Sequence, residues 1–264
     1  MSKGKDYFSK SLEKGLRILS LFDHKNKVLT QSDIARRLDL NMTSTYRYIN
    51  TLVEMGYLEK NEKTKGICPS AHCLVFCNNL FRATGHLKMI RQVVDQVHRQ
   101  HNISIEVAFA DGDSLIRIYN REAEETFTYS LPDSTQNSLH TTALGKAYLS
   151  TLPDGQLWER IKSMKLMART NKTITDRDTL LKEILTAKTN QYATTDGEYL
   201  QGLLAIAAPI YDPGSGVGVG AVSFDFSIMQ HSALAVREKY SELIKEIAER
   251  LSAFASVDSN LIGK

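Results

Sequence analysis

The sequence predicts an α+β protein, in which a small and mostly helical part precedes a larger part built on an antiparallel sheet. Apolar residues recur at helical spacing in residues 30–58. From residue 104 onward, several stretches alternate apolar and polar residues, as strands with one buried face do. The predicted boundaries are 1–70 for a first domain, 71–83 for a connecting helix and 84–264 for a second domain.

Residues 30–58 predict two short helices joined by a tight turn. Thr30 can cap the first helix, and Asp33 three residues later completes an approximate capping box. Asn41 can cap the second helix, and Gly56 can end it. The side chains expected to point inward are Ile34, Ala35 and Leu38 in the first helix, and Thr45, Tyr48, Ile49 and Leu52 in the second.

The second helix of this pair keeps a polar face that packing leaves free. Its side chains are short hydrogen-bonding groups with one guanidinium, which suits a helix lying in the major groove of DNA. The sequence therefore predicts a helix-turn-helix whose partner is double-stranded DNA. The candidate contact residues of this helix are Thr43, Ser44, Thr45, Tyr46, Arg47 and Asn50.

A β-hairpin is expected directly after the helix pair. Residues 57–60 are predicted to form a strand, residues 61–66 a polar turn and residues 67–68 a returning strand. Pro69 must end that strand, because proline cannot donate to a ladder. Such a hairpin is the wing of a winged helix-turn-helix, where basic side chains contact phosphates. The candidate phosphate contacts are Lys60, Lys63 and Lys65.

The charge distribution agrees with this assignment. Residues 1–66 hold 13 Lys and Arg against 8 Asp and Glu, whereas the remaining residues hold 20 against 22. A basic segment joined to a near-neutral body fits a polyanion-binding module attached to another domain. A local excess of five charges is also common on solvated surfaces, so it counts only because it coincides with the helix pair.

Three further helices are predicted around this region. Residues 71–82 are apolar on most of their surface, so this linker helix is expected to be buried against a partner. A helix over residues 11–22 is expected to turn Leu12, Leu16, Ile18 and Leu19 inward, and one over residues 86–101 to carry Leu87, Ile90, Val94, Val97 and His101 as its stripe.

The second domain combines strands and helices. The turn Asp111-Gly112-Asp113 predicts a hairpin between two alternating stretches. The final helix is expected to carry Leu234 among its inward residues. The predicted strands are residues 104–110, 114–120, 126–131, 203–211 and 217–226, and the predicted helices are residues 142–151, 154–164, 176–190 and 230–255.

Several classes of site are disfavoured. The glycines from Gly214 to Gly220 run into an alternating strand, whereas a phosphate-binding loop must lead into a helix. No nucleophile–base–acid order is present, so neither an enzyme nor a cofactor is expected. Cys68, Cys73 and Cys77 match no zinc spacing, and buried thiols are the expected role. The chain has no apolar run of membrane-spanning length and no secretion signal at its start, so a cytoplasmic protein is expected.

Three stretches of the second domain are candidate walls of one small-molecule pocket. They are residues 138–146, residues 195–199 and residues 223–225. The first would present backbone amides at a helix start, where a carboxylate can bind. Helix capping and turn formation would select the same residue types, so both interpretations stay open. His140 and Asp196 are candidates from these stretches.

The whole chain resembles the IclR family of bacterial transcriptional regulators. The N-terminal match is SLEKGLRILSLF followed by LTQSDIARRLDLNMTSTYRYINTLVEMGYLEK. The match in the second domain is LHTTALGKAYLS, then DGEYLQGLLAIAAPIYD, then GAVSF. The resemblance implies a winged helix-turn-helix, a linker helix and a GAF-like effector domain, with dimers or tetramers that bind palindromic operators and no catalysis.

The resemblance also implies an effector site. A carboxylate of the effector would be held by backbone amides at Ala143 and Leu144, with Thr195, Ala205, Ser223 and Asp225 completing the pocket. An acid at position 225 would repel a carboxylate ligand at close range, so a neutral, hydroxylated or amine-bearing effector is also consistent. Two alternatives remain for the second domain, namely an enzyme or a domain that only dimerises.

Overall fold

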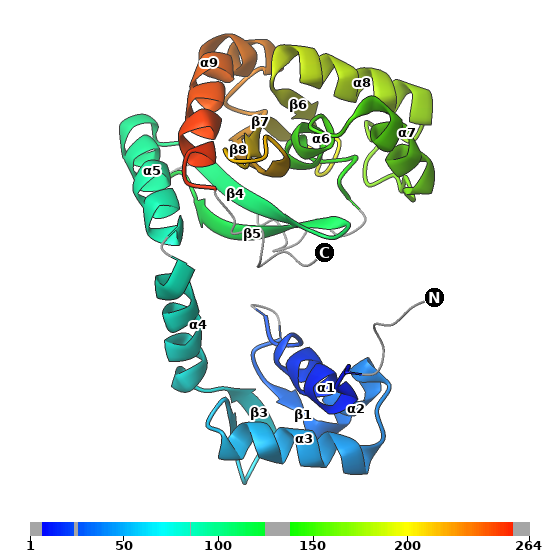
Figure 1. Ribbon diagram of the computed structural model, residues 1–264, viewed down its shortest axis with the longest axis vertical. Coiled ribbons are helices and arrows are strands. Elements are labelled where there is room, and N and C mark those ends of the chain that lie inside the picture. Colours follow the sequence, from blue (N-terminus) through cyan, green and yellow to red (C-terminus); the bar gives the residue numbers. More distant parts are fainter. Residues whose placement is uncertain (1–6, 24–25, 85, 125–137, 256–264) are drawn as a thin grey trace. The chain divides into compact units, whose positions relative to one another are not determined.

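The computed structural model describes residues 7–23, 26–84, 86–124 and 138–255 (Figure 1). The chain divides into two compact units, residues 1–84 and residues 85–264. Each unit has its own hydrophobic core, so each is described by itself.

The first unit is a winged helix-turn-helix followed by a helix. Its three short strands pair antiparallel in the order β1-β3-β2. Ile18, Ile34, Ile49 and Ile67 are buried at its centre, so three helices and the sheet share one core. The elements are α1 (Lys10–Leu19), β1 (Leu29–Thr30), α2 (Gln31–Leu38), α3 (Met42–Glu54), β2 (Leu58–Lys60), β3 (Gly66–Pro69) and α4 (Ala71–Thr84).

Local signals in the sequence set the ends of the helix pair. The Thr30 hydroxyl accepts from the Asp33 amide, and the Asp33 carboxylate accepts from the Thr30 amide, which completes the predicted capping box. Asp39 ends α2 in the left-handed conformation. The Asn41 side chain then accepts from the Ser44 amide at 2.8 Å and starts α3. The predicted helix pair and hairpin are therefore confirmed, with Pro69 as the last residue of β3.

Two predicted helix faces of the first unit differ from the structure. Leu12 and Leu16 were expected inside, but their side chains are 63% and 56% exposed. Only the last turn of α1, with Ile18 and Leu19, packs on the core. On α4, Leu74 is 73% exposed and Val75 is 53% exposed, so no described part of this chain covers them, and their burial against a partner stays a prediction.

The second unit is a five-stranded antiparallel sheet with helices on both faces. Its strand order is β5-β4-β8-β7-β6. The predicted α+β class is confirmed. The helices are α5 (His86–His101), α6 (Ala143–Leu149), α7 (Asp154–Ser163), α8 (Arg177–Asn190) and α9 (Ala233–Ser252), and the strands are β4 (Ser104–Asp111), β5 (Ser114–Arg121), β6 (Ala193–Asp196), β7 (Leu203–Tyr211) and β8 (Gly218–Ser227).

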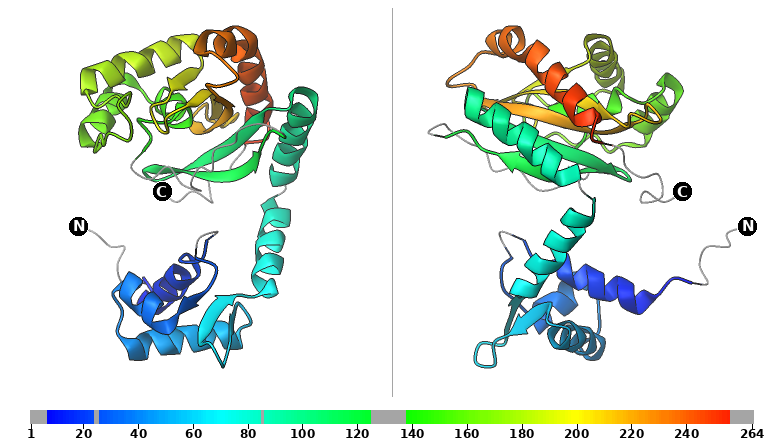
Figure 2. Two further views of the ribbon diagram at one scale, coloured as in Figure 1. Left: turned by 180° about the vertical axis from the view of Figure 1, so that it is seen from behind. Right: turned by 60° about the vertical axis from the view of Figure 1, so that its left-hand side comes forward.

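The two faces of this sheet carry side chains of different size. Helices α5 and α9 cover one face over large residues such as Ile206 and Phe224 (Figure 2). Helices α6, α7 and α8 cover the other face, where alanines predominate on β7 and β8. A Cβ atom on Gly145 would overlap the backbone of Leu139, so glycine is required there. Small residues thus let α6 lie close to the sheet.

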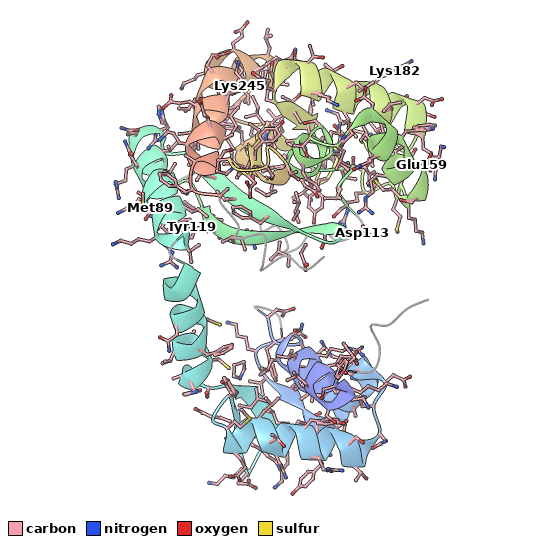
Figure 3. The ribbon with its side chains drawn as sticks, viewed as in Figure 1. Met89, Asp113, Tyr119, Glu159, Lys182 and Lys245 are labelled. Atoms are coloured by element: carbon pink, nitrogen blue, oxygen red, sulfur yellow. The ribbon has the colours of Figure 1, made fainter. Side chains whose placement is uncertain are left out.

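Side-chain contacts fix the hairpin β4–β5 at both ends (Figure 3). The Tyr119 hydroxyl donates to the Asp95 carboxylate of α5 at 2.8 Å. At the turn, Asp113 pairs with Arg160 of α7. Helices on both faces therefore hold this hairpin.

Some predictions for the second unit need correction. The strand β6 was missed by the sequence analysis, and the predicted strand 126–131 lies outside the described residues. On α5 the buried histidine is His98, whose Nδ1 lies 3.1 Å from the Ile103 carbonyl oxygen, whereas His101 is exposed. Leu234 is 59% exposed because α9 begins at Ala233, at the edge of the core.

Candidate functional site

The exposed face of α3 is the first candidate site. Ile49 and Leu52 fix which side of the helix is buried. On the opposite side, the side chains of Thr43, Tyr46 and Arg47 are exposed. Ser44 and Asn50 lie beside them and are half-buried. This face offers donors and acceptors without an apolar covering, so it can contact a polar surface such as base edges.

Thr45, a predicted contact residue, does not belong to this face. Its side chain is fully buried, and its hydroxyl donates to the Asn41 carbonyl oxygen at 2.9 Å. Helical spacing correctly predicts that Thr45 points inward. The prediction that Thr45 contacts DNA is wrong. Its role is to fix the first turn of α3.

The three predicted lysines of the wing occupy different settings. Lys60 on β2 places its Nζ atom 5.7 Å from the ring centroid of Tyr46, which joins the wing to the α3 face. In the turn, the Asn61 side chain accepts from the amides of Lys63 and Thr64, both at 3.0 Å. Lys63 is exposed at this turn, while Lys65 pairs with Glu62 at 3.3 Å. Exposed ammonium groups therefore flank the polar helix face.

A pocket between α6 and the sheet of the second unit is the other candidate site. It contains six of the eight residues predicted for it. The volume open to the centre of a water-sized sphere is about 30 Å³. The pocket therefore suits a ligand of few atoms. The pocket is lined by Glu106, Thr142, Ala143, Leu144, Thr195, Tyr199, Leu203, Ala205, Ser223 and Asp225.

One side of the pocket is formed by the sheet, and the strand register explains its composition. Asp225 of β8 lies opposite Ala205 of β7, and Ala205 lies opposite Thr195 of β6. One step along, Ser223 lies opposite Glu106 of β4. We call these five residues the pocket floor.

The other side of the pocket is the start of α6. The Thr142 hydroxyl accepts from the Gly145 amide at 3.0 Å and caps the helix. The amides of Ala143 and Leu144 come next, and the first amides of a helix have no acceptor within it. The predicted capping role and the predicted lining role therefore both apply to this segment.

The charge of Asp225 depends on its surroundings. Burial raises the pKa of its carboxyl from the ordinary 3.8 to about 7, although the Ser223 hydroxyl and the Arg117 guanidinium lower it. The Ser223 hydroxyl is buried and makes no hydrogen bond of ordinary geometry within the described structure. Asp225 is therefore only partly ionised at neutral pH.

A buried ion pair connects two walls of the pocket. The Lys146 ammonium of α6 donates to the Glu198 carboxylate at 2.8 Å, and Glu183 of α8 lies 3.8 Å away. The Lys146 side chain is 1% exposed. Burial raises the pKa of the Glu198 carboxyl, while Lys146 opposes that rise. The pair joins α6 to the loop that carries Tyr199.

Two predicted pocket residues lie elsewhere. His140 is buried and its Nε2 lies 3.1 Å from the Met167 carbonyl oxygen. Burial lowers the pKa of His140, so the ring is neutral and structural. Asp196 is directed to the surface, where its carboxylate pairs with Lys172 at 3.0 Å. Neither residue is among those that line the pocket.

Four lining residues were not among the predicted site residues. Thr142 and Tyr199 belong to stretches that the sequence identifies as walls, so residue type alone would have found them. Leu203 lies on the same strand face as Ala205, two residues away, whereas only the register between strands brings Glu106 to the pocket.

The cysteines form no disulfide. The Cys73 thiol lies 3.0 Å from the Tyr57 carbonyl oxygen, and burial raises the pKa of this thiol, which disfavours the reactive thiolate. In the part of the chain that the structure describes, no three His, Cys, Asp or Glu side chains could jointly hold a metal ion. No helix there is both long and apolar enough to cross a bilayer.

Comparisons with known proteins give the family. Residues 11–62 match the IclR helix-turn-helix domain, and residues 83–253 match the family described as bacterial transcriptional regulator IclR C-terminal. The HTH-type transcriptional regulator BhcR of Paracoccus denitrificans is 26% identical over 250 residues, which cover 92% of this chain and 89% of that protein.

Solved structures share the fold. An IclR-type regulator from Alicyclobacillus acidocaldarius superposes with a TM-score of 0.84 at 20% identity, covering 95% of this chain and 100% of the other. An IclR homologue from Microbacterium hydrocarbonoxydans, solved in complex with 4-hydroxybenzoate, gives a TM-score of 0.74 at 20% identity and covers 92% and 98%. Because both segments match in order over most of its length, the chain belongs to the IclR family of bacterial transcriptional regulators.

Proposed function

We propose that this regulator contacts operator DNA with the exposed face of α3 and with the wing, and that a small effector binds in the pocket of the second unit. The observation that carries the first part is the division of α3. One side is buried on the core, and the other presents Arg47, Asn50 and short hydroxyl side chains. A helix with this division can enter a major groove without losing its packing.

Within this proposal, two kinds of contact have different tasks. Arg47 and Asn50 read base edges, because a guanidinium can pair with guanine and an amide with adenine. Lys60, Lys63 and Lys65 contact phosphates, which position the protein without reading sequence. Lys60 also holds Tyr46 against the wing, so this aromatic side chain acts at the border between both kinds of contact.

The effector proposal rests on the pocket. A related protein of this fold was solved with 4-hydroxybenzoate, which supports a ligand site in this family. In this chain, polar side chains from β4, β6 and β8 and the start of α6 converge on one small volume. A ligand that prefers one of two arrangements of the protein shifts operator affinity by its differential affinity for them.

Self-association is part of the proposal. The exposed apolar side chains of α1 and α4 support contacts with a second copy of the chain. A dimer would bind a palindromic operator, because its symmetry repeats the α3 face at two half-sites. Light scattering of the purified protein measures whether the dimer pairs further into a tetramer.

We propose regulation without catalysis. The pocket holds two carboxyls but no nucleophile paired with a base. The competing function is an enzyme whose operator binding is secondary. Incubation of the protein with pocket ligands, followed by mass spectrometry of the small molecules, would favour the enzyme if any ligand were consumed.

The main experiment is selection of DNA from a random duplex library by the purified protein. The proposal expects an enriched motif with two-fold symmetry. Arg47→Ala should lose the motif, whereas Arg99→Ala, an exposed arginine of α5, should retain it. Failure of the wild-type protein to enrich any sequence would refute operator binding. Equal enrichment by both variants would refute the role given to α3.

A further inference from the structure

The pocket has an unusual charge balance for a cavity that accepts a polar metabolite. Two of its lining residues are acids, Glu106 and Asp225. None of the lining residues is Lys, Arg or His. Its remaining polar side chains are the hydroxyls of Thr142, Thr195, Tyr199 and Ser223.

The register of the sheet places Asp225 where a ligand can reach it. Its neighbour on β7 is Ala205, whose methyl group cannot cover a carboxylate. Its neighbour on β4 is Ser104, also a small residue. Large residues would have closed this position, so small neighbours leave the carboxyl of Asp225 open to the pocket.

No cation near Asp225 offsets the effect of burial on the pKa of its carboxyl. Burial is the main influence on its pKa, which rises to about 7, and the Arg117 guanidinium of β5 lowers it least among the causes. The Ser223 hydroxyl, buried beside it, has no partner of ordinary hydrogen-bond geometry. Glu106 has interactions of its own, whereas Asp225 and Ser223 lie together on the pocket floor, within reach of a ligand.

We infer that the pocket takes a small amine-bearing molecule, whose ammonium group donates to the Asp225 carboxylate and to the Ser223 hydroxyl. This inference rests on the proposed effector function of the same pocket. An ammonium supplies the countercharge that the floor lacks, and it has three donors for the acceptors there. A carboxylate in the same position would face a like charge and gain no cationic partner from the lining.

The ammonium also explains why the buried Ser223 hydroxyl has no partner of ordinary hydrogen-bond geometry. A buried carboxyl that must stay ionised is normally paired or accepts several hydrogen bonds. The bound cation would complete this set and drive Asp225 into its charged form. The raised pKa then describes the empty pocket, and ligand binding lowers it.

The test compares three probe series that share their carbon skeletons. They are ethylamine, ethanol and acetate; butylamine, butan-1-ol and butyrate; and benzylamine, benzyl alcohol and benzoate. Thermal unfolding of the full chain at about pH 8 measures binding, because a ligand of the native state raises Tm. At this pH the amines are protonated. We expect at least one amine to raise Tm more than its matched alcohol and carboxylate.

Two variants assign the effect to Asp225. Asp225→Asn keeps the shape and removes the charge, and it should weaken calorimetric binding of the amine by about tenfold or more. Asp196→Asn removes an acid that lies outside the pocket and pairs with Lys172, so it should bind like the wild-type protein. Amine affinity should also increase between pH 6 and pH 8. The charged and titratable groups near Asp225 are Glu106, Arg117 and Tyr199.

Several outcomes would overturn this inference. A larger Tm increase with the carboxylates, equal increases with the alcohols, or no increase with any series would exclude an ammonium ligand. Unchanged amine affinity in Asp225→Asn would exclude the residue. The DNA selection reports the proposed function separately, because the wild-type protein should enrich its motif without any ligand.

Discussion

The two candidate sites differ in how the chain builds them. The α3 face comes from one continuous segment, and its polar residues stay outside because only the opposite side of α3 carries the residues that pack on the core. The pocket takes residues from β4, β6, β7, β8 and the start of α6, which are far apart in the sequence. Substitutions at an open face should therefore change binding alone, whereas substitutions near the closed pocket should also change stability.

The largest expected effect tests this contrast at the buried ion pair. Lys146→Met removes the ammonium 2.8 Å from Glu198 and leaves an uncompensated buried carboxyl. Breaking such a pair costs about 3–5 kcal/mol, so we expect a loss of this order in the free energy of unfolding of the second unit. Urea unfolding followed by circular dichroism measures it.

A surface pair provides the matched control. Lys162→Met removes a partner of Glu159 at the same distance of 2.8 Å, but on exposed side chains, and should cost less than about 1 kcal/mol. If both variants lost equal stability, burial of the charge would not be the reason for the loss in Lys146→Met.

The second effect lies on the open face. Arg47→Ala should weaken binding to the selected operator by about 1–3 kcal/mol while the unfolding curve stays unchanged. Fluorescence anisotropy with labelled duplexes measures this change. A lower Tm in the variant would show that Arg47 stabilises the fold, contrary to its exposed position.

The third effect is the pH dependence that Asp225 gives to stability. The native carboxyl has a pKa of about 7, and the unfolded one an ordinary value of 3.8. Between these values the native state binds more protons, so stability falls as pH rises toward 7. Asp225→Asn cannot ionise and should exceed the wild-type Tm at pH 8, by about 2–4 °C for each kcal/mol that the buried charge costs.

The same variant supplies its own control for that prediction. Below about pH 3 both proteins carry an uncharged group at position 225 in the native and unfolded states, so their Tm values should converge. Differential scanning calorimetry across the pH series measures the two curves. Parallel curves would mean that burial of Asp225 does not destabilise the native state.

The smallest effect belongs to the wing. Lys63→Ala should reduce the slope of log affinity against log salt by about 1, because one phosphate contact is lost. The loss should be similar for operator and unrelated duplexes. A loss confined to the operator would make Lys63 a base contact.

The sequence predicted the first site better than the second. Helical spacing placed Ile49 and Leu52 inside and Arg47 outside, because a helix has one period that the sequence displays directly. Thr45 shows the limit of residue type, since a hydroxyl that suits a base contact equally suits a bond to the Asn41 carbonyl oxygen. Leu12 and Leu16 were misplaced because spacing identifies an apolar face but not the surface that covers it.

For the pocket, the pairing of distant strands determines which residues lie together, and local sequence patterns do not show it. Nothing near Glu106 in the sequence indicates that it lies opposite Ser223, because register depends on contacts between distant strands. His140 lies only two residues before the capping residue Thr142, yet its ring turns to Met167. The stretch 223–225 already included Asp225, whereas only the family resemblance selected Ala205, which no local signal distinguishes from other strand residues.

The alanine at position 205 has a consequence for how such a sensor diversifies. Ala205 lies opposite Asp225 in the sheet, so a single codon change at position 205 would alter the free space beside that acid. A duplicated gene could acquire a new inducer by this route while its recognition helix, encoded far upstream, kept the ancestral target sites. Responsiveness and promoter choice can then evolve independently.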